Sequence, residues 1–388
     1  MPKTVVILGA GLAGVPIAHY LASPQIPDLR VVLVSPNTHF YWNLASVRFV
    51  LPSDKHSMKE DKYLFPIADQ FAKYPKDKFE FVNGAATQLH PDRNAVTVAL
   101  IEGGNEIEIQ YHTLIVATGS SYAGGMPWKG VGTTPETRAA IAQLRSQIQA
   151  AKSIVVAGAG ATGVEFAGEL GAAYAKKGVK KITILSTDPL PLESRLQDKV
   201  RATAKKELEK LGVQVLTNAR VVSSNGKEIE IEQKGAGKKT LTADLLIPTY
   251  GATPNTAFVP ASMISSTSPG RLRQGSDLRV PGHSNIFVVG DAGDLQPLQA
   301  VYAEQQARHL MQQFASYFAS NGKTVAPYKV DDKVMFAVTI GPDRGTGQMG
   351  TFQPPSLLIW WFKGKHIGTN YSGDWAGGIR SSNGAWPK

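Results

Sequence analysis

The sequence predicts an α/β protein built from two similar strand-helix-strand units, and three observations support this. Two glycine motifs, Gly9-Ala10-Gly11-Leu12-Ala13-Gly14 and Gly158-Ala159-Gly160-Ala161-Thr162-Gly163, match Gly-x-Gly-x-x-Gly. Each follows a short apolar run, residues 5–8 and 154–157, as a turn between strand and helix must. Such a turn holds a dinucleotide pyrophosphate at a helix N-terminus. The 388 residues suffice for two or three domains, so we expect two Rossmann-like dinucleotide-binding domains.

The remaining elements follow from short apolar runs and helical periodicity. In the first unit we expect a helix at residues 12–22, with Pro16 early enough to cost little. The first unit's strands are expected at residues 4–8, 31–34, 79–82, 95–100, 106–110 and 113–116. The second unit's elements are expected as strands at 154–157, 182–185, 213–216 and 245–247, helices at 163–176 and 198–211, and a hairpin-like stretch at 221–241. A strand at 286–289 and a helix at 298–319 come next.

The pattern changes after Asn321-Gly322. Here we expect strands at residues 334–340 and 350–352 and an aromatic helix or strand at 357–365. A third Gly-x-Gly-x-x-Gly match, residues 345–350, follows a turn-like Pro-Asp-Arg run, so we interpret it as a loop and not as a nucleotide site.

These elements predict a second domain inserted into the first. The first dinucleotide-binding domain is expected at residues 1–125 and 256–325, and the second at 126–255. A small α+β C-terminal domain is expected at 326–388.

The composition narrows the chemistry. The chain has no cysteine, which excludes a redox-active disulfide, a thiolate nucleophile and a cysteine metal site. Its eight histidines show no ligand spacing, so we expect no metal. The net charge is +10, but the lysines at 199–210 alternate with Glu207 and Glu209, which is typical of a solvated helix face. We therefore do not expect nucleic-acid binding.

Several segments together resemble a known family. They are His39-Phe40-Tyr41-Trp42-Asn43 before Arg48, the turns Ala117-Thr118-Gly119 and Gly251-Ala252-Thr253, and Gly282-His283-Ser284-Asn285-Ile286 before Gly290-Asp291. The chain resembles the apoptosis-inducing-factor-like and ferroptosis-suppressor-like branch of the pyridine nucleotide-disulphide oxidoreductases, over nearly its whole length. The resemblance implies a glutathione-reductase-like fold, FAD in the first domain, NADPH or NADH in the second, and reduction of a quinone or similar small acceptor.

The resemblance implies an FAD site made of the first glycine turn and several distant residues. An arginine can form charge-assisted bonds to pyrophosphate, and an aspartate can accept ribityl hydroxyl protons. A helix start beside the flavin would stabilise negative charge there. The residues are Gly9, Ala10, Gly11, Leu12, Ala13, Gly14, Ser35, Arg48, Val82, Thr118, Gly119, Asp291, Ala300 and Val301.

The expected pyridine-nucleotide site comprises Gly158, Gly160, Gly163, Ser186 and Gly251. An acidic residue usually holds the ribose about twenty residues past each glycine turn. Serine stands there in both units, at positions 35 and 186. Removal of a carboxylate lowers repulsion of the NADPH 2′-phosphate, but no arginine follows directly, so NADPH has only a slight preference over NADH.

Two catalytic residues are implied by the resemblance. Glu165, four residues before Glu169 on the second-motif helix, is expected toward the nicotinamide, and Lys329 near the flavin. Their ordinary alternatives are a solvated helix carboxylate and an exposed linker lysine. Because hydride transfer belongs to the cofactors, we expect no catalytic triad.

The expected location is cytoplasmic, with membrane association open. The apolar residues 5–22 are explained by a strand, turn and helix instead of a signal peptide. The start Met1-Pro2 lacks the glycine that N-myristoylation needs. The Trp-rich residues 357–363 suit a membrane interface, a domain core or a dimer contact, so monomer and homodimer both stay open.

Three functional readings follow. The first is an FAD-dependent NAD(P)H:quinone or similar acceptor oxidoreductase. The second is a pathway-specific flavoenzyme that acts on one specialised metabolite. The third is a flavoprotein whose main role is to bind DNA or a partner protein.

Overall fold

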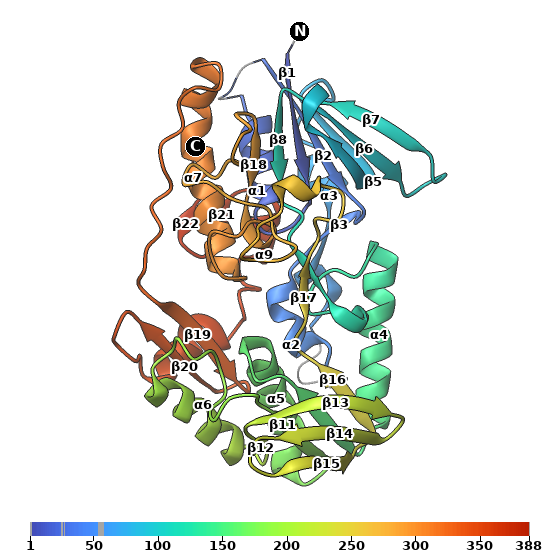
Figure 1. The fold of residues 1–388 in the computed structure, drawn as a ribbon, viewed down its shortest axis with the longest axis vertical. Helices are drawn as coiled ribbons and strands as arrows, with labels where there is room; N and C mark the ends of the chain where they lie inside the picture. Colours follow the sequence, from blue (N-terminus) through green and yellow to red (C-terminus); the bar gives the residue numbers. More distant parts are fainter. Residues whose placement is uncertain (1, 25, 27, 53–57, 388) are drawn as a thin grey trace.

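The computed structural model describes residues 2–24, 26, 28–52 and 58–387. Two open sheets lie at opposite ends of an elongated molecule, joined by a narrower waist (Figure 1). Met1, on which the N-terminal expectation partly depends, lies outside the described residues.

The first sheet has the strand order β18-β8-β1-β2-β5-β6-β7. The strands β18 to β5 run parallel, and β6 and β7 add antiparallel pairs. Their bounds are β1 (Lys3–Leu8), β2 (Leu29–Ser35), β5 (Phe79–His90), β6 (Ala95–Leu100), β7 (Glu106–Gln110), β8 (Thr113–Val116) and β18 (Ile286–Val288). The helices α1 (Gly14–Ala22) and α7 (Ala300–Ala319) pack together beside this sheet. Both begin two residues later than predicted.

The second sheet is fully parallel, with the order β12-β11-β10-β16. Its strands are β10 (Ser153–Ala157), β11 (Lys181–Leu185), β12 (Gln214–Leu216) and β16 (Leu245–Pro248). The accompanying helices are α4 (Thr134–Ala150), α5 (Ala161–Ala173) and α6 (Asp198–Lys210). The stretch predicted as a hairpin is a three-stranded antiparallel sheet of β13 (Ala219–Asn225), β14 (Glu228–Gln233) and β15 (Gly237–Thr242).

The chain passes between the two sheets through a pair of short strands. β9 (Ser120–Tyr122) leaves the first sheet, and β17 (Ala252–Pro254) returns antiparallel to it. β18 then joins the first sheet beside β8, so the second sheet is formed entirely by residues inserted into the first fold. The predicted α/β class with two Rossmann-like units is confirmed; the boundaries at 125, 255 and 325 remain our proposed assignment.

An aromatic core fills a segment that the sequence shows only as loop-rich. It comprises β3 (His39–Tyr41), α2 (Ser46–Phe49), β4 (Leu64–Pro66) and α3 (Ile67–Phe71). Phe40, Trp42 and Phe49 are fully buried there. Trp42 Nε1 donates to the carbonyl of Ile367 at 3.0 Å, so this core extends to the C-terminal segment.

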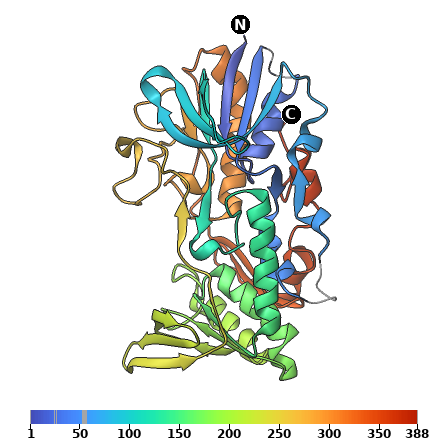
Figure 2. The ribbon, with the colours of Figure 1, turned by 90° about the vertical axis from the view of Figure 1, so that its right-hand side faces the viewer.

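The C-terminal segment is spread over both ends of the molecule. β19 (Met335–Ile340) and β20 (Arg344–Met349) form a hairpin that packs on α5 and α6. α8 (Ser356–Ile359) continues into a π-helical turn at Trp360–Gly364, which confirms the helical alternative. The chain then returns to the first sheet's end, where α9 (Ser372–Ala376) contacts α1, followed by β21 (Arg380–Ser381) and β22 (Gly384–Ala385) (Figures 1 and 2).

We predicted that the third glycine motif is a loop, and this is wrong: most of it forms the strand β20. A Cβ added to Gly345 would lie 2.5 Å from Ile359 Cγ2, and one on Gly347 would lie 3.0 Å from Ile359 Cδ1. These glycines therefore let α8 pack directly on the strand, and no nucleotide turn is formed. The strand predicted at residues 350–352 is also wrong, because the chain turns there and retains only the isolated bridge between Met349 and Phe352.

Candidate active site

The two glycine turns have nearly the same backbone geometry. Gly9 and Gly158 have φ of 107° and 105°, values that favour glycine. A Cβ on Gly14 would lie 1.9 Å from the Gly9 carbonyl oxygen, and one on Gly163 would lie 1.9 Å from that of Gly158. The first and third glycines of each motif are therefore required by the turn and the helix packed against it.

The middle glycines face free space instead. A Cβ built on Gly11 or Gly160 meets no atom within 4 Å among the described residues. No packing reason thus requires glycine at either position. The open cradle fits a group that approaches the backbone closely, such as a pyrophosphate.

A single cavity of about 1160 Å³ connects the two turns. It runs from the first glycine turn and Ser35, past the waist strands, to the start of α5 and the C-terminal segment. Thirteen predicted residues line it: Gly9, Ala10, Gly11, Leu12, Ala13, Ser35, Thr118, Gly119, Gly160, Glu165, Asp291, Ala300 and Val301. Among the described residues, Thr118 Oγ1 is one of a few buried side-chain atoms without a hydrogen-bond partner, as expected where a ligand supplies one.

Asp291 lies at the centre of a polar cluster in this cavity. Its Oδ2 accepts a hydrogen bond of 2.8 Å from Ser120 Oγ and forms an ion pair with Lys129. Neither partner was predicted from the sequence. Ser120 directly follows a turn that the sequence did predict, but Lys129 is 162 positions from Asp291 in the sequence.

The helix α7 begins at the cavity. Gln299 has extended backbone angles, and its side chain makes no capping hydrogen bond within the described chain. The first amides of a helix lack intrahelical partners and carry partial positive charge. Because Ala300 and Val301 line the cavity, this end of α7 can stabilise negative charge on a bound ligand.

Glu165 lies at the other end of the cavity, with only 7% of its surface exposed. Its Oε1 pairs with Lys363 Nζ at 2.8 Å and accepts the backbone N–H of Thr339 at 3.1 Å. Lys363 also donates to the carbonyl of Ala337 at 2.7 Å and lines the cavity itself. The solvated-helix alternative for Glu165 does not hold, and Lys363 is a third site residue, after Ser120 and Lys129, that the sequence did not predict.

Arg48 does not line the cavity. Its Nε and Nη2 donate to Glu169 Oε1 at 2.9 and 2.7 Å, and its Nη1 donates to the carbonyl of Gly364 at 2.9 Å. Burial raises the pKa of the Glu169 carboxyl, although the guanidinium acts in the opposite direction. This buried pair joins α2, α5 and the π-helical turn, and the Arg48 guanidinium contacts Glu169 and Gly364 in this structure.

Other predicted residues also lie outside the cavity. Lys329 is exposed in an irregular segment, so the lysines that the structure brings to the site are Lys129 and Lys363. Val82 packs in the core below the first sheet, while residues 84–86 of the same strand line the cavity. The other predicted residues that do not line it are Gly14, Gly158, Gly163, Ser186 and Gly251.

The two serines behave alike. Ser35 Oγ accepts the backbone N–H of Asn37 at 3.1 Å, and Ser186 Oγ accepts that of Asp188 at 3.3 Å. Each hydroxyl therefore stabilises the turn that follows its strand, where an acidic residue would hold a ribose.

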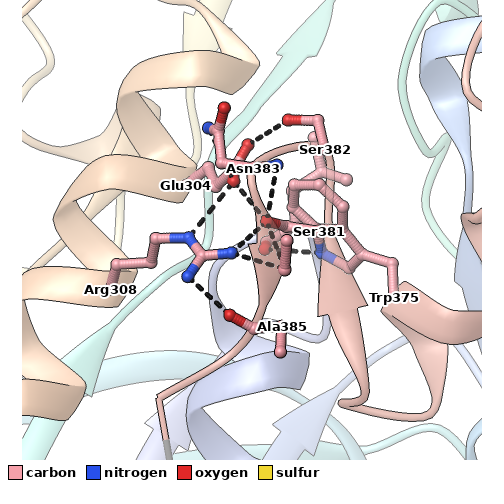
Figure 3. A network of polar contacts seen from close by, with 9 residues as sticks. Glu304, Arg308, Trp375, Ser381, Ser382, Asn383 and Ala385 are labelled. Carbon is pink, nitrogen blue, oxygen red and sulfur yellow. Dashed lines mark hydrogen bonds and ion pairs between the residues drawn. The ribbon is translucent and has the colours of Figure 1, made fainter.

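The hairpin of β21 and β22, called the C-terminal hairpin below, forms one wall of the cavity, where Ser382 and Asn383 line it. Glu304 of α7 holds this hairpin, and the Glu304 side chain is only 2% exposed. Its Oε1 accepts hydrogen bonds from Ser381 Oγ and Asn383 Nδ2, and its Oε2 accepts Ser382 Oγ at 2.6 Å. Figure 3 shows Arg308 beside it, paired with Oε1 at 3.3 Å and bonded to the Ala385 carbonyl.

The same wall is attached to the first glycine turn. Trp375 Nε1 donates to the carbonyl of Leu12 at 3.0 Å. His19 of α1 bonds the carbonyl of Ala376 at 2.8 Å and stacks on Phe71 with ring centroids 3.8 Å apart. Burial lowers the pKa of His19 to about 3, which keeps this ring neutral.

The chain is similar to several known proteins. The family model for pyridine nucleotide-disulphide oxidoreductases matches residues 3–307. Oxidoreductase ptaL of Pestalotiopsis fici is 36% identical over 92% of this chain and 94% of its own length. Ferroptosis suppressor protein 1 of Xenopus tropicalis is 30% identical over 89% of this chain and 88% of its own. Apoptosis-inducing factor homolog B of Dictyostelium discoideum is 25% identical over 94% and 93%. The resemblance seen in the sequence is thus confirmed.

Solved structures share the fold. Sulfide:quinone oxidoreductase of Aquifex aeolicus superposes with a TM-score of 0.76 at 16% identity, covering 97% of this chain and 92% of that one. NDH2 of Plasmodium falciparum in complex with NADH gives 0.77 at 16% identity, covering 96% and 97%.

Proposed function

We propose, because this chain belongs to the pyridine nucleotide-disulphide oxidoreductase family, that it passes electrons from NAD(P)H through FAD to a quinone or similar small acceptor. The oxidoreductase class and the dependence on FAD and NAD(P)H follow from the family itself. One observation carries the acceptor proposal: the cavity that starts at the first glycine turn ends among apolar side chains of the C-terminal segment. These are Met335, Phe336, Met349 and Phe362.

The residues present fit FAD at the first turn. Among the described residues, no atom fills the space at Gly11, the Thr118 hydroxyl has no hydrogen-bond partner, and no side chain caps the start of α7, so all three can contact a ligand. Asp291, which is held by Lys129 and Ser120, would accept hydrogen bonds from the hydroxyl groups of the ribityl chain. The bound flavin supplies the chemistry of taking a hydride and releasing electrons singly or in pairs.

The protein would supply a proton. A quinone takes up two electrons and two protons to become a hydroquinone, whereas NAD(P)H delivers two electrons with one proton. Lys363 Nζ, which lies in the cavity and is paired with Glu165, is placed to donate the second proton to an acceptor oxygen and recover it from solvent. Its side chain is 31% exposed, so solvent can reach it.

The test uses the purified yellow protein under anaerobic conditions. NADPH or NADH should bleach the flavin bands rapidly, and a ubiquinone analogue should restore them. Lys363→Met should lower quinone turnover roughly a hundredfold, as expected for loss of a general acid. Turnover with a dye that accepts electrons without protons should stay unchanged, and Lys365→Met should behave as wild type. Slow, incomplete bleaching would instead favour a mainly binding role.

A pathway-specific flavoenzyme is the second candidate. It is favoured by the similarity to oxidoreductase ptaL and to oxidoreductase phnG of Penicillium herquei, which is 30% identical over 94% of this chain and 93% of its own length. An enzyme of this kind would reduce quinone analogues poorly, although its flavin would still bleach quickly with NAD(P)H. Steady-state comparison of several quinones with dyes therefore separates the two candidates.

We also propose that α8 and the π-helical turn after it contact a membrane surface. Leu357, Leu358, Trp361 and Phe362 are each more than 40% exposed, so they do not form a domain core. Phe362 and Met335 are exposed and also line the cavity, so the apolar face is continuous with the cavity lining. In the described chain, no helix is long and apolar enough to span a bilayer.

Vesicles test this contact. Wild type should sediment with vesicles of neutral and anionic lipid, and the double variant Leu357→Ser, Trp361→Ser should not. The variant should retain dye turnover. A concentration-dependent dimer that the same substitutions dissolve, without vesicle binding, would assign this face to a second copy instead.

A further inference from the structure

The two dinucleotide-binding units can be aligned residue by residue through their hydrogen bonds. The Gly9 N–H donates to the Val34 carbonyl, and the Gly158 N–H donates to the Leu185 carbonyl. Val34 pairs with Val82 in the first sheet, while Leu185 pairs with Leu216 in the second. Residues 84–86 of the first unit therefore correspond to residues 218–220 of the second.

Corresponding residues line corresponding spaces. Residues 84–86, with Pro36, line the part of the large cavity beyond the end of β2. In the second unit, residues 218–220, with Thr187, line a separate open pocket of about 410 Å³. The β14–β15 turn closes its far side with residues 232–235 and Gly237. In both units this space lies past the strand that follows the glycine turn, where the adenosine half of a dinucleotide extends.

The chemistry of the two spaces differs. Ala86 in the first corresponds to Arg220 in the second, and Lys234 adds another cation there. Ser186 stands where a carboxylate would repel a phosphate on the ribose. One carboxylate, Glu232, is present, so the pocket lining has an excess of one positive charge.

We infer that this pocket receives the adenosine end of NADPH and that Arg220 and Lys234 recognise its 2′-phosphate. The inference rests on the proposed function, since it assigns part of the second nucleotide's site. The cations come from the antiparallel sheet and not from the residues directly after β11, where the sequence shows none.

Glu232 positions Arg220 for this role. The Nε and Nη2 atoms of Arg220 donate to Glu232 Oε2 at 2.8 and 2.6 Å. A guanidinium has five N–H groups, so three remain for a phosphate. The Arg220 side chain is 68% exposed, which leaves these groups accessible to a ligand.

Calorimetry with two small probes tests the assignment without turnover. 2′,5′-ADP carries the 2′-phosphate, and 5′-AMP lacks it. The wild-type holoenzyme should bind 2′,5′-ADP at least about tenfold more tightly, because hydrogen bonds to charged groups contribute this much. The double variant Arg220→Ala, Lys234→Ala should lose that preference and keep its affinity for 5′-AMP. Lys227→Ala, which removes one positive charge at the opposite end of the same sheet, should keep it.

Three outcomes would overturn the inference. They are a wild type without preference for 2′,5′-ADP, a double variant that retains the preference, and a double variant that loses both probes equally. The last would mean that Arg220 contacts the adenine. Rapid bleaching by NADH in any of these cases would leave the proposed oxidoreductase function intact.

Discussion

The two dinucleotide turns share one backbone geometry but lie in different surroundings. Both turns line the large cavity, and the first is also hydrogen-bonded to a wall formed by α9 and the β21–β22 hairpin, through Trp375 and Leu12. The pocket that corresponds to the adenosine end in the second unit is smaller and open, and its Arg220 is largely exposed. We infer from this comparison that the glycine turn binds a dinucleotide. The segments that cover the turn then decide whether the protein retains that dinucleotide or exchanges it.

The largest effects are expected from substitutions of the middle glycines of the two turns, and they should differ between the turns. Gly11→Val should give a folded but colourless protein, because the added side chain fills space that only a ligand uses. Gly160→Val should keep the flavin and lose rapid bleaching by NAD(P)H. Absorbance spectra and stopped-flow mixing measure both. If Gly160→Val removed flavin while Gly11→Val spared it, the order of the two sites would be reversed.

A smaller effect is expected from the wall that only the first site has. Glu304→Ala removes the carboxylate paired with Arg308 and the acceptor of three hydroxyl and amide donors, so the free energy of unfolding should fall by about 3 kcal/mol. Flavin should also dissociate faster. Asp374→Ala breaks an exposed pair with Arg380 in the same segment and should cost about 1 kcal/mol or less. Equal costs for the two variants would argue against a structural role for the Glu304 network. Urea titration gives both values.

The smallest effect concerns pH. His19 has a pKa of about 3 when folded and an ordinary value of 6.5 when unfolded, so only the unfolded chain takes up a proton between these values. The contribution of neutral His19 to the free energy of unfolding should therefore be fully present above about pH 6.5. As the pH decreases below this value, the free energy of unfolding should decrease by up to about 1.4 kcal/mol per pH unit. At pH 5 this amounts to about 2 kcal/mol. The region 126–255 contains no histidine, so the loss should concern the first domain and its wall.

Unfolding midpoints from pH 7 to 5 provide the measurement. His19→Gln keeps an amide that can bond the Ala376 carbonyl but cannot titrate, so its midpoints should decline less than those of wild type. Parallel curves for the two proteins would assign the acid sensitivity to other groups.

Local patterns were sufficient for much of the fold. An apolar run followed by glycines predicts β1 with α1 and β10 with α5, since turn, strand and helix depend on neighbouring residues. The same reasoning misread β20, because its glycines serve contact with Ile359 and not a turn. The core around Trp42 was missed for a related reason: its partner Ile367 is 325 positions away.

By itself, the sequence determined two nucleotide turns, their order along the chain, the absence of thiol chemistry and the presence of Glu165 and Asp291. Only the tertiary structure decided the ion-pair partners: Lys363 for Glu165, Lys129 for Asp291, and Glu169 for Arg48. The physical reason is that an ion pair forms wherever packing brings two side chains together. Residues separated by more than a hundred positions carry no local signal of that meeting.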